Sequence, residues 1–230
     1  MRRSAASANS KLLSSACCAP AAEADHPSLD TARLSFFRVP LGCEAAKGLG
    51  CGIKAKPVLN ALADHPDVRH AWLNRNGTIV AVLWDEVAGS ASRGEQVHSV
   101  LARHGLETHE LTGATRGAAV RDFSAAEGWY RGDTVDRLSE EEAAIIAARL
   151  VRRVNAKVRL ADENARTLTA ALAEVCRREL VDRPLTSARV RRQRIANEIV
   201  KAGRSLLEGA ALRALEDAAA LGHRPLSGEE

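Results

Sequence analysis

The feature that most constrains the fold is an Asn-Gly dipeptide between two strand-like runs in VRHAWLNRNGTIVAVLW, residues 68–84. Asn76 and Gly77 readily adopt the positive φ angles of a tight hairpin turn. The residues on either side are rich in the β-branched and aromatic side chains that favour strands. The sequence therefore predicts a β-hairpin here, with two neighbouring antiparallel strands.

Patterns before and after the hairpin extend it into a larger α+β unit. Residues 33–41, RLSFFRVPL, predict a strand that Pro40 ends. Pro57 suits the first turn of a short helix, and Gly105 lies where the C-cap of a second helix is expected. Residues 106–111 can close the sheet as an edge strand. The order β-α-β-β-α-β predicts an antiparallel sheet with two helices on one face.

Strand patterns stop after about Thr112, and apolar residues then recur at helical spacing. Ser139 and Glu142 have the spacing of a capping box at the start of a long helix, about 140–159. Three more helices are expected before about residue 222, and a composition with only 3% aromatic residues suits them. We therefore expect an α+β domain followed by an all-α helical domain. The expected divisions are a disordered tail at 1–31, the α+β domain at 32–113, a linker at 114–123, the helical domain at 124–222 and a tail at 223–230.

Cysteine usage and hydropathy indicate a cytoplasmic protein. The five cysteines are odd in number and irregularly spaced, and a chain of 230 residues can bury a core without disulfides. The N-terminus lacks the apolar core of a secretion signal, and no run approaches the roughly 20 apolar residues of a membrane span. Cys176 lies on the apolar face of a predicted helix and is expected in the core.

Two other cysteines lie in GCEAAKGLGCGIKAKPVLNAL, residues 42–62, where Cys43 and Cys51 occupy a glycine-rich loop ahead of a helix. Together with the hairpin, this segment resembles the heavy-metal-associated domains of copper chaperones, metal-pumping ATPases and periplasmic mercury-binding proteins. The spacing from Cys51 to Pro66 and the run AWLNRNGTIVAV match that family, and the resemblance covers about residues 33–112. It implies a ferredoxin-like βαββαβ fold.

The resemblance also implies a soft-metal site made of loop thiolates. The family's Cys-x-x-Cys pair is not intact, because CGIK places Lys54 where the second cysteine would stand. Cys43, eight residues before Cys51, could fold back to replace it. Two thiolates suit Cu(I) or Hg(II), which are soft and accept nearly linear sulfur coordination. Lys54 and the N-terminal end of the helix would favour the charged sulfurs.

We therefore hypothesise a non-enzymatic, metallochaperone-like protein in which Cys43 and Cys51 bind the metal, with Cys17 and Cys18 of the tail as auxiliary ligands. The helical domain would mediate self-association or docking to a metal transporter or another target protein. The opposing interpretation, that these thiols are incidental features of a loop and a tail, stays open. A reversible disulfide between Cys43 and Cys51 is the least favoured hypothesis because of their wide spacing.

A regulatory or interaction module without metal is the competing hypothesis. In RVRRQR, residues 189–194, contacts to nucleic acid or a partner protein would come from Arg189, Arg191, Arg192 and Arg194. Successive arginines on a helix point in different directions, and a net charge of +4 is small for this length, so we favour a solvated face. The sequence contains no P-loop, nucleophile elbow or dinucleotide fingerprint, and we expect no enzymatic activity.

Overall fold

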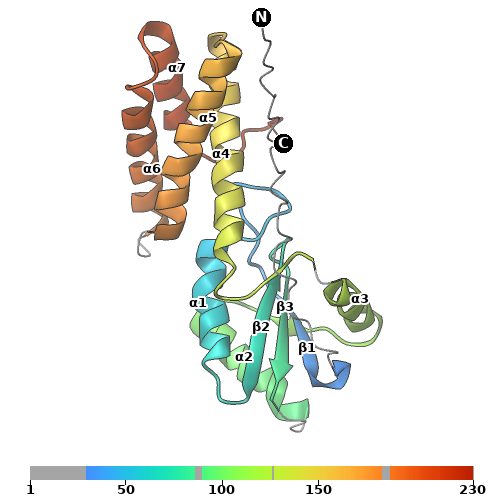
Figure 1. Ribbon diagram of the computed structural model, residues 1–230. Helices are drawn as coiled ribbons and strands as arrows, with labels where there is room; N and C mark the ends of the chain where they lie inside the picture. The colour runs from blue at the N-terminus through green and yellow to red at the C-terminus, as the bar shows by residue number, and fades with distance from the viewer. Residues whose placement is uncertain (1–29, 86–89, 126, 183–186, 230) are drawn as a thin grey trace, which may run out of the picture.

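The computed structural model of the chain describes residues 30–85, 90–125, 127–182 and 187–229 (Figure 1). It is an α+β structure with a five-stranded antiparallel sheet. The tail expected at 1–31, with Cys17 and Cys18, lies outside the described residues apart from its last two positions. None of the helices in the described ranges is both long enough and apolar enough to cross a membrane.

The sheet is built around the predicted hairpin. Its strands are β1 (Leu34–Arg38), β2 (Val68–Asn74), β3 (Ile79–Trp84), β4 (His109–Glu110) and β5 (Trp129–Tyr130). They are ordered β4-β1-β3-β2-β5, and each pairs antiparallel with its neighbours. Gly77 has a φ of 69° in the turn between β2 and β3, so the hairpin prediction is confirmed. Strand β5 is an addition to the predicted strands.

The helices fall into two groups along the chain (Figure 1). In the described residues they are α1 (Gly52–Ala63), α2 (Ser90–Arg103), α3 (Gly113–Ser124), α4 (Asp136–Lys157), α5 (Asp162–Arg177), α6 (Ala188–Gly203) and α7 (Gly209–Ala220). The first three pack against the sheet. Helices α4 to α7 lie side by side, each on the next, and α7 returns to α4. A 3-10 turn, Thr31–Arg33, precedes β1, and a π-helical turn, Arg178–Asp182, extends α5.

Helices cover both faces of the sheet. Helices α1 and α2 share one core with Phe37 of β1. On the opposite face, Phe123 of α3 packs edge-on against Phe36, with ring centroids 5.9 Å apart. Residues 114–123, expected as a linker, therefore lie in a helix, because Phe123 covers an aromatic surface that the sheet would otherwise expose.

Helix α1 begins earlier than the sequence predicted. The prediction placed Pro57 in the first turn, but the helix starts at Gly52 and contains Pro57 in its interior. Cys51 has extended backbone angles and occupies the N-cap position. A Cβ on Gly52 would lie 2.3 Å from Oγ of Ser139 in α4, so glycine at this position lets the start of α1 approach α4 closely.

Helix α4 also starts earlier than predicted, at Asp136. Ser139 and Glu142, expected to form a capping box, lie inside the helix and are both buried. Leu138 belongs to the core beneath the sheet, and Leu150 belongs to the core among α4 to α7. The two cores therefore meet along α4, beside the cysteine loop.

Candidate dithiol site

The loop between β1 and α1 brings Cys43 and Cys51 together. Gly42 and Gly50 form an antiparallel bridge, and the N–H of Cys43 donates to the carbonyl of Leu49 at 2.7 Å. In such a ladder Cys43 and Cys51 point to the same face, as diagonal neighbours across the bridge. A separation of eight positions is therefore closed by a short β-like turn.

Glycines allow this loop to lie against the turn between β2 and β3. Gly48 has a φ of 72° and reverses the chain between the two cysteines. The N–H of Gly50 donates to the carbonyl of Arg75 at 2.6 Å, and a Cβ on Gly50 would lie only 3.1 Å from Cα of Gly77. A side chain at Gly50 would therefore force the loop or the hairpin turn to shift by a few tenths of an ångström. The Asn-Gly turn thus shapes the cysteine loop as well as the sheet.

The two sulfurs interact directly and unequally. The Cys43 thiol donates a hydrogen bond to the Cys51 sulfur, and this contact is the main reason that the pKa of Cys51 is lowered and the pKa of Cys43 is raised. Burial and the charge of Glu142 add to the rise at Cys43. At Cys51, burial opposes the fall in pKa, whereas the backbone N–H and the ammonium of Lys54 support it. The Cys51 sulfur makes no well-directed capping hydrogen bond to α1. Cys51 is therefore the first of the pair to ionise.

Glu142 of α4 forms the inner wall of the site. The residue is 5% exposed, and its Oε2 has no hydrogen-bond partner among the described residues. Burial raises the pKa of Glu142, while its contact with Cys43 and the charges of Arg191 and Lys54 moderate the rise. Cys176 of α5 lies within electrostatic reach of Glu142 and is fully buried, as predicted. Burial, together with nearby carboxylates, raises the pKa of Cys176 to about 12.

Charged side chains lie on the solvent side of the two half-buried cysteines. Lys54 is exposed and forms an ion pair with Glu44 at 3.9 Å. Glu44 also pairs with Arg224 near the end of the chain. Cys43 contacts both the core beneath the sheet and the core among α4 to α7. The dithiol therefore lies at the junction of these two cores and remains partly open to solvent.

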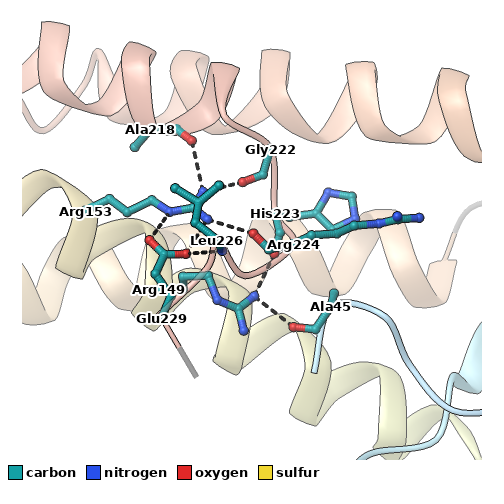
Figure 2. Close-up of polar contacts among 9 residues, drawn as sticks. All are labelled: Ala45, Arg149, Arg153, Ala218, Gly222, His223, Arg224, Leu226 and Glu229. Carbon is teal, nitrogen blue, oxygen red and sulfur yellow. Dashed lines mark hydrogen bonds and ion pairs between the residues drawn. The ribbon is translucent and has the colours of Figure 1, made fainter. Parts of the chain in front are cut away.

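Arg149 of α4 anchors the cysteine loop (Figure 2). Its guanidinium is buried, and Nη1 donates to the carbonyl of Ala45 at 2.8 Å and to the carbonyl of His223 at 2.7 Å. His223 is itself surrounded by arginines, and burial together with their charges lowers the pKa of His223 to about 4. One arginine therefore links the loop that carries Cys43 to the end of the chain.

Arg153, one turn further along α4, holds the C-terminal segment, residues 222–229 (Figure 2). Its Nε and Nη2 donate to the two carboxylate oxygens of Glu229 at 2.8 and 2.6 Å, and Nη2 also donates to the carbonyl of Arg224 at 2.7 Å. The bonds from Arg153 to the carboxylate, together with the backbone N–H of Leu226, lower the pKa of Glu229 to about 2. The segment expected as a tail at 223–230 is therefore folded onto α4 as far as Glu229.

The basic run on α6 divides between two environments. Arg189 and Arg192 are exposed, whereas Arg191 and Arg194 are half-buried. Arg194 lies 3.7 Å from the buried carboxylate of Glu179, and Arg191 acts on the carboxyl that forms the inner wall of the dithiol site. Half of the run therefore faces carboxylates of the protein itself, and a nucleic-acid contact would rest on the other half.

Sequence reasoning missed Glu142 and Arg149 as parts of the site. A spacing of four residues places Glu142 on the same helix face as Ile146 and Leu150. A carboxyl on an apolar helix face is expected to be buried and to have a specific partner, and this pattern could have identified Glu142. Arg149 gave no comparable signal, because its partners are backbone carbonyls of segments that are distant in the sequence.

Within the described ranges, no group of three or more His, Cys, Asp or Glu side chains is placed to hold a metal ion. The arrangement can offer two sulfurs to a soft ion, or it can let the two sulfurs form a disulfide when an external oxidant takes up two electrons. Comparison with known proteins adds no relative: no family model, curated protein or solved structure matches the chain.

Proposed function

We propose that the protein binds a soft metal ion of the Cu(I) or Hg(II) type through Cys43 and Cys51. The observation that carries the proposal is the bridge between Gly42 and Gly50, which places Cys43 and Cys51 on one face of the loop as diagonal neighbours. Soft thiolate ligands select such ions, and a nearly linear site of two sulfurs needs no third ligand.

The surroundings of the two sulfurs also suit a cation. Ligation replaces the proton that Cys43 donates to Cys51, so that both sulfurs bind as thiolates. Glu142 on the inner side and Lys54 on the outer side then set the charge around the ion. Metal affinity should fall as the pH drops, because protons compete for the sulfurs.

We further propose that β1 to β4, with α1 and α2, form a ferredoxin-like βαββαβ unit of the heavy-metal-associated type. The support is the order of the elements along the chain and the strand order β4-β1-β3-β2. Helices α4 to α7 would act as a helical domain for self-association or for docking to a metal transporter or another cytoplasmic target. Cys17 and Cys18 would serve as auxiliary thiols for capturing the metal.

A competition titration tests metal binding. The full chain carrying Cys17→Ser and Cys18→Ser, called the tail variant, is reduced and titrated with Cu(I) against a chromogenic Cu(I) chelator. We expect about one tightly bound Cu(I) per chain, which is lost when Cys43→Ser and Cys51→Ser are added. Cys176→Ala is the matched control, because that thiol is fully buried and uptake should not change. Equal uptake without the two loop cysteines would contradict the proposal.

A further inference from the structure

We infer that Cys43 and Cys51 form a reversible disulfide by exchange with small-molecule disulfides such as oxidised glutathione. This activity goes beyond metal binding and does not depend on it, although it uses the same two sulfurs. Three observations carry the inference: the bridge between Gly42 and Gly50 that places both cysteines on one face, the position of Cys51 at the start of α1, and the partial exposure of both cysteines.

The sulfurs are already neighbours in the reduced protein. The N–H of Cys43 donates to the carbonyl of Leu49 and the N–H of Cys51 donates to the carbonyl of Leu41, each at 2.7 Å, so both cysteines stand on one face of the ladder that Gly42 and Gly50 close. A disulfide needs Cα atoms within about 7 Å, a distance that diagonal neighbours in a two-stranded ladder approach. Gly48, with a φ of 72°, gives the intervening turn the freedom to make the remaining adjustment. The wide sequence spacing is therefore no obstacle to the bond.

The electrostatic surroundings assign different roles to the two sulfurs. Cys51 is the N-cap residue of α1, where the helix dipole and the ammonium of Lys54 favour negative charge. Cys43 lies beside the carboxyl of Glu142, which disfavours a further negative charge. Cys51 is therefore the attacking thiolate, and Cys43 is the resolving thiol.

The exchange proceeds in two balanced steps. The Cys51 thiolate attacks one sulfur of oxidised glutathione, which forms a mixed disulfide with Cys51 and releases one glutathione thiolate. The Cys43 sulfur then attacks the Cys51 sulfur and gives its proton to the second glutathione, which leaves as a thiol. One disulfide is broken and one is formed, and two electrons pass from the protein dithiol to oxidised glutathione.

The third described cysteine does not compete for this reaction. Cys176 is 0% exposed in the core among α4 to α7, whereas Cys43 and Cys51 are half-buried. A small disulfide that reaches the protein surface therefore meets the loop pair and not Cys176.

Peptide mapping in a glutathione redox buffer tests the inference. The tail variant is equilibrated at a series of ratios of reduced to oxidised glutathione, quenched with acid, alkylated and digested with trypsin. The lysine between the two cysteines lets trypsin place them in peptides 39–47 and 48–54. We expect these peptides to be joined by a disulfide in oxidising buffer and to separate as alkylated thiols in reducing buffer.

Single variants separate the two roles. In the tail variant, Cys43→Ser should trap Cys51 as a mixed disulfide with glutathione, whereas Cys51→Ser should leave Cys43 as a thiol. Far-UV circular dichroism confirms that each variant is folded. The inference would be overturned if both cysteines stay thiols in oxidising buffer, or if a mixed disulfide on Cys51 persists while Cys43 is present.

The result is distinguishable from the fate of the proposed metal site. A protein that forms the loop disulfide but withdraws no Cu(I) from the chelator when reduced would keep this inference and lose the proposed function. A protein that binds Cu(I) but never joins peptides 39–47 and 48–54 would keep the proposed metal-binding function and lose this inference.

Discussion

At the scale of single residues, the site depends on two thiols that are chemically unequal. Cys51 accepts a hydrogen bond from Cys43, so one sulfur is prepared to ionise and the other keeps its proton. The cysteines and Lys54 could be found from the sequence, because they lie within one short segment. Glu142 could not be assigned to the site in this way, because its carboxyl reaches the sulfurs only through the packing of α4 against the cysteine loop.

Removing the thiol of Cys43 should make Cys51 less reactive. Cys43→Ala in the tail variant deletes the hydrogen bond that chiefly lowers the pKa of Cys51, so this pKa should rise. Alkylation of Cys51 by iodoacetamide near pH 7 should slow by about threefold for each unit by which the pKa of Cys51 rises. A higher pKa leaves less thiolate, but the remaining thiolate is a stronger nucleophile, and this offsets part of the loss. The rate measured against pH gives the shift. Cys176→Ala should leave the profile of Cys51 unchanged, and an equally unchanged profile in Cys43→Ala would contradict the hydrogen bond.

Replacing Glu142 should stabilise the protein at neutral pH. Burial raises the pKa of Glu142 above its ordinary value of 4.5. The folded protein therefore holds the Glu142 proton more tightly than the unfolded chain does. This contribution to the unfolding free energy is fully present below about pH 4.5 and is lost as the pH rises through the pKa of Glu142 in the folded protein. Glu142→Gln never ionises and should unfold at higher urea concentration than the wild type at pH 7. The advantage should shrink as the pH falls toward 4.5. Glu140→Gln, at an exposed position on the same helix, should show no such pH-dependent advantage.

At the scale of elements, the sequence predicted the turns and helix ends that depend on residues close together in the chain. The Asn-Gly turn at Gly77 and the end of α2 at Gly105 both have the positive φ angles that their glycines indicated, 69° and 70°. Helix α3 and the start of α1 were not predicted, because they depend on contacts between distant segments. Phe123 meets the aromatic face of the sheet, and Gly52 meets the start of α4.

The junction between α1 and α4 should be sensitive to a single methyl group. A Cβ on Gly52 would lie 2.3 Å from Ser139 Oγ and 2.9 Å from the carbonyl of Val135, so Gly52→Ala should cost about 1–3 kcal/mol of unfolding free energy. Gly117→Ala in α3 is the matched control, because its Cβ would meet only the end of a flexible arginine at 3.7 Å. That control should be neutral or stabilising by up to about 1 kcal/mol. Urea denaturation measures both variants, and equal effects would argue against the close contact.

At the scale of the whole molecule, the cysteine loop and the C-terminal segment, residues 222–229, both form hydrogen bonds with helix α4. Arg149 donates to both Ala45 and His223, and Arg153 binds Glu229 (Figure 2). No local sequence pattern predicts this arrangement, because each arginine binds groups that are many residues away in the chain. Two neighbouring arginines of α4 therefore hold both the cysteine loop and the segment at residues 222–229.

His223 should make the protein less stable in mild acid. Its folded pKa of about 4 lies below the ordinary value of 6.5, so the unfolded chain takes up the proton first and stability falls as the pH drops from about 6.5 to about 4. His223→Gln removes this dependence, so the unfolding free energy should fall less steeply across that interval than in the wild type. His104→Gln, at an exposed position, should keep the wild-type slope. Identical slopes for His223→Gln and the wild type would show that His223 is not buried in its neutral form.

The most direct measurement of a two-sulfur site is the X-ray absorption spectrum of the tail variant loaded with Hg(II). The account predicts two sulfur neighbours around the metal, contributed by Cys43 and Cys51, and loss of one of them in Cys43→Ser. A tail variant whose metal has fewer than two sulfur neighbours, or a sulfur shell that is unchanged when both loop cysteines are replaced by serine, would contradict it.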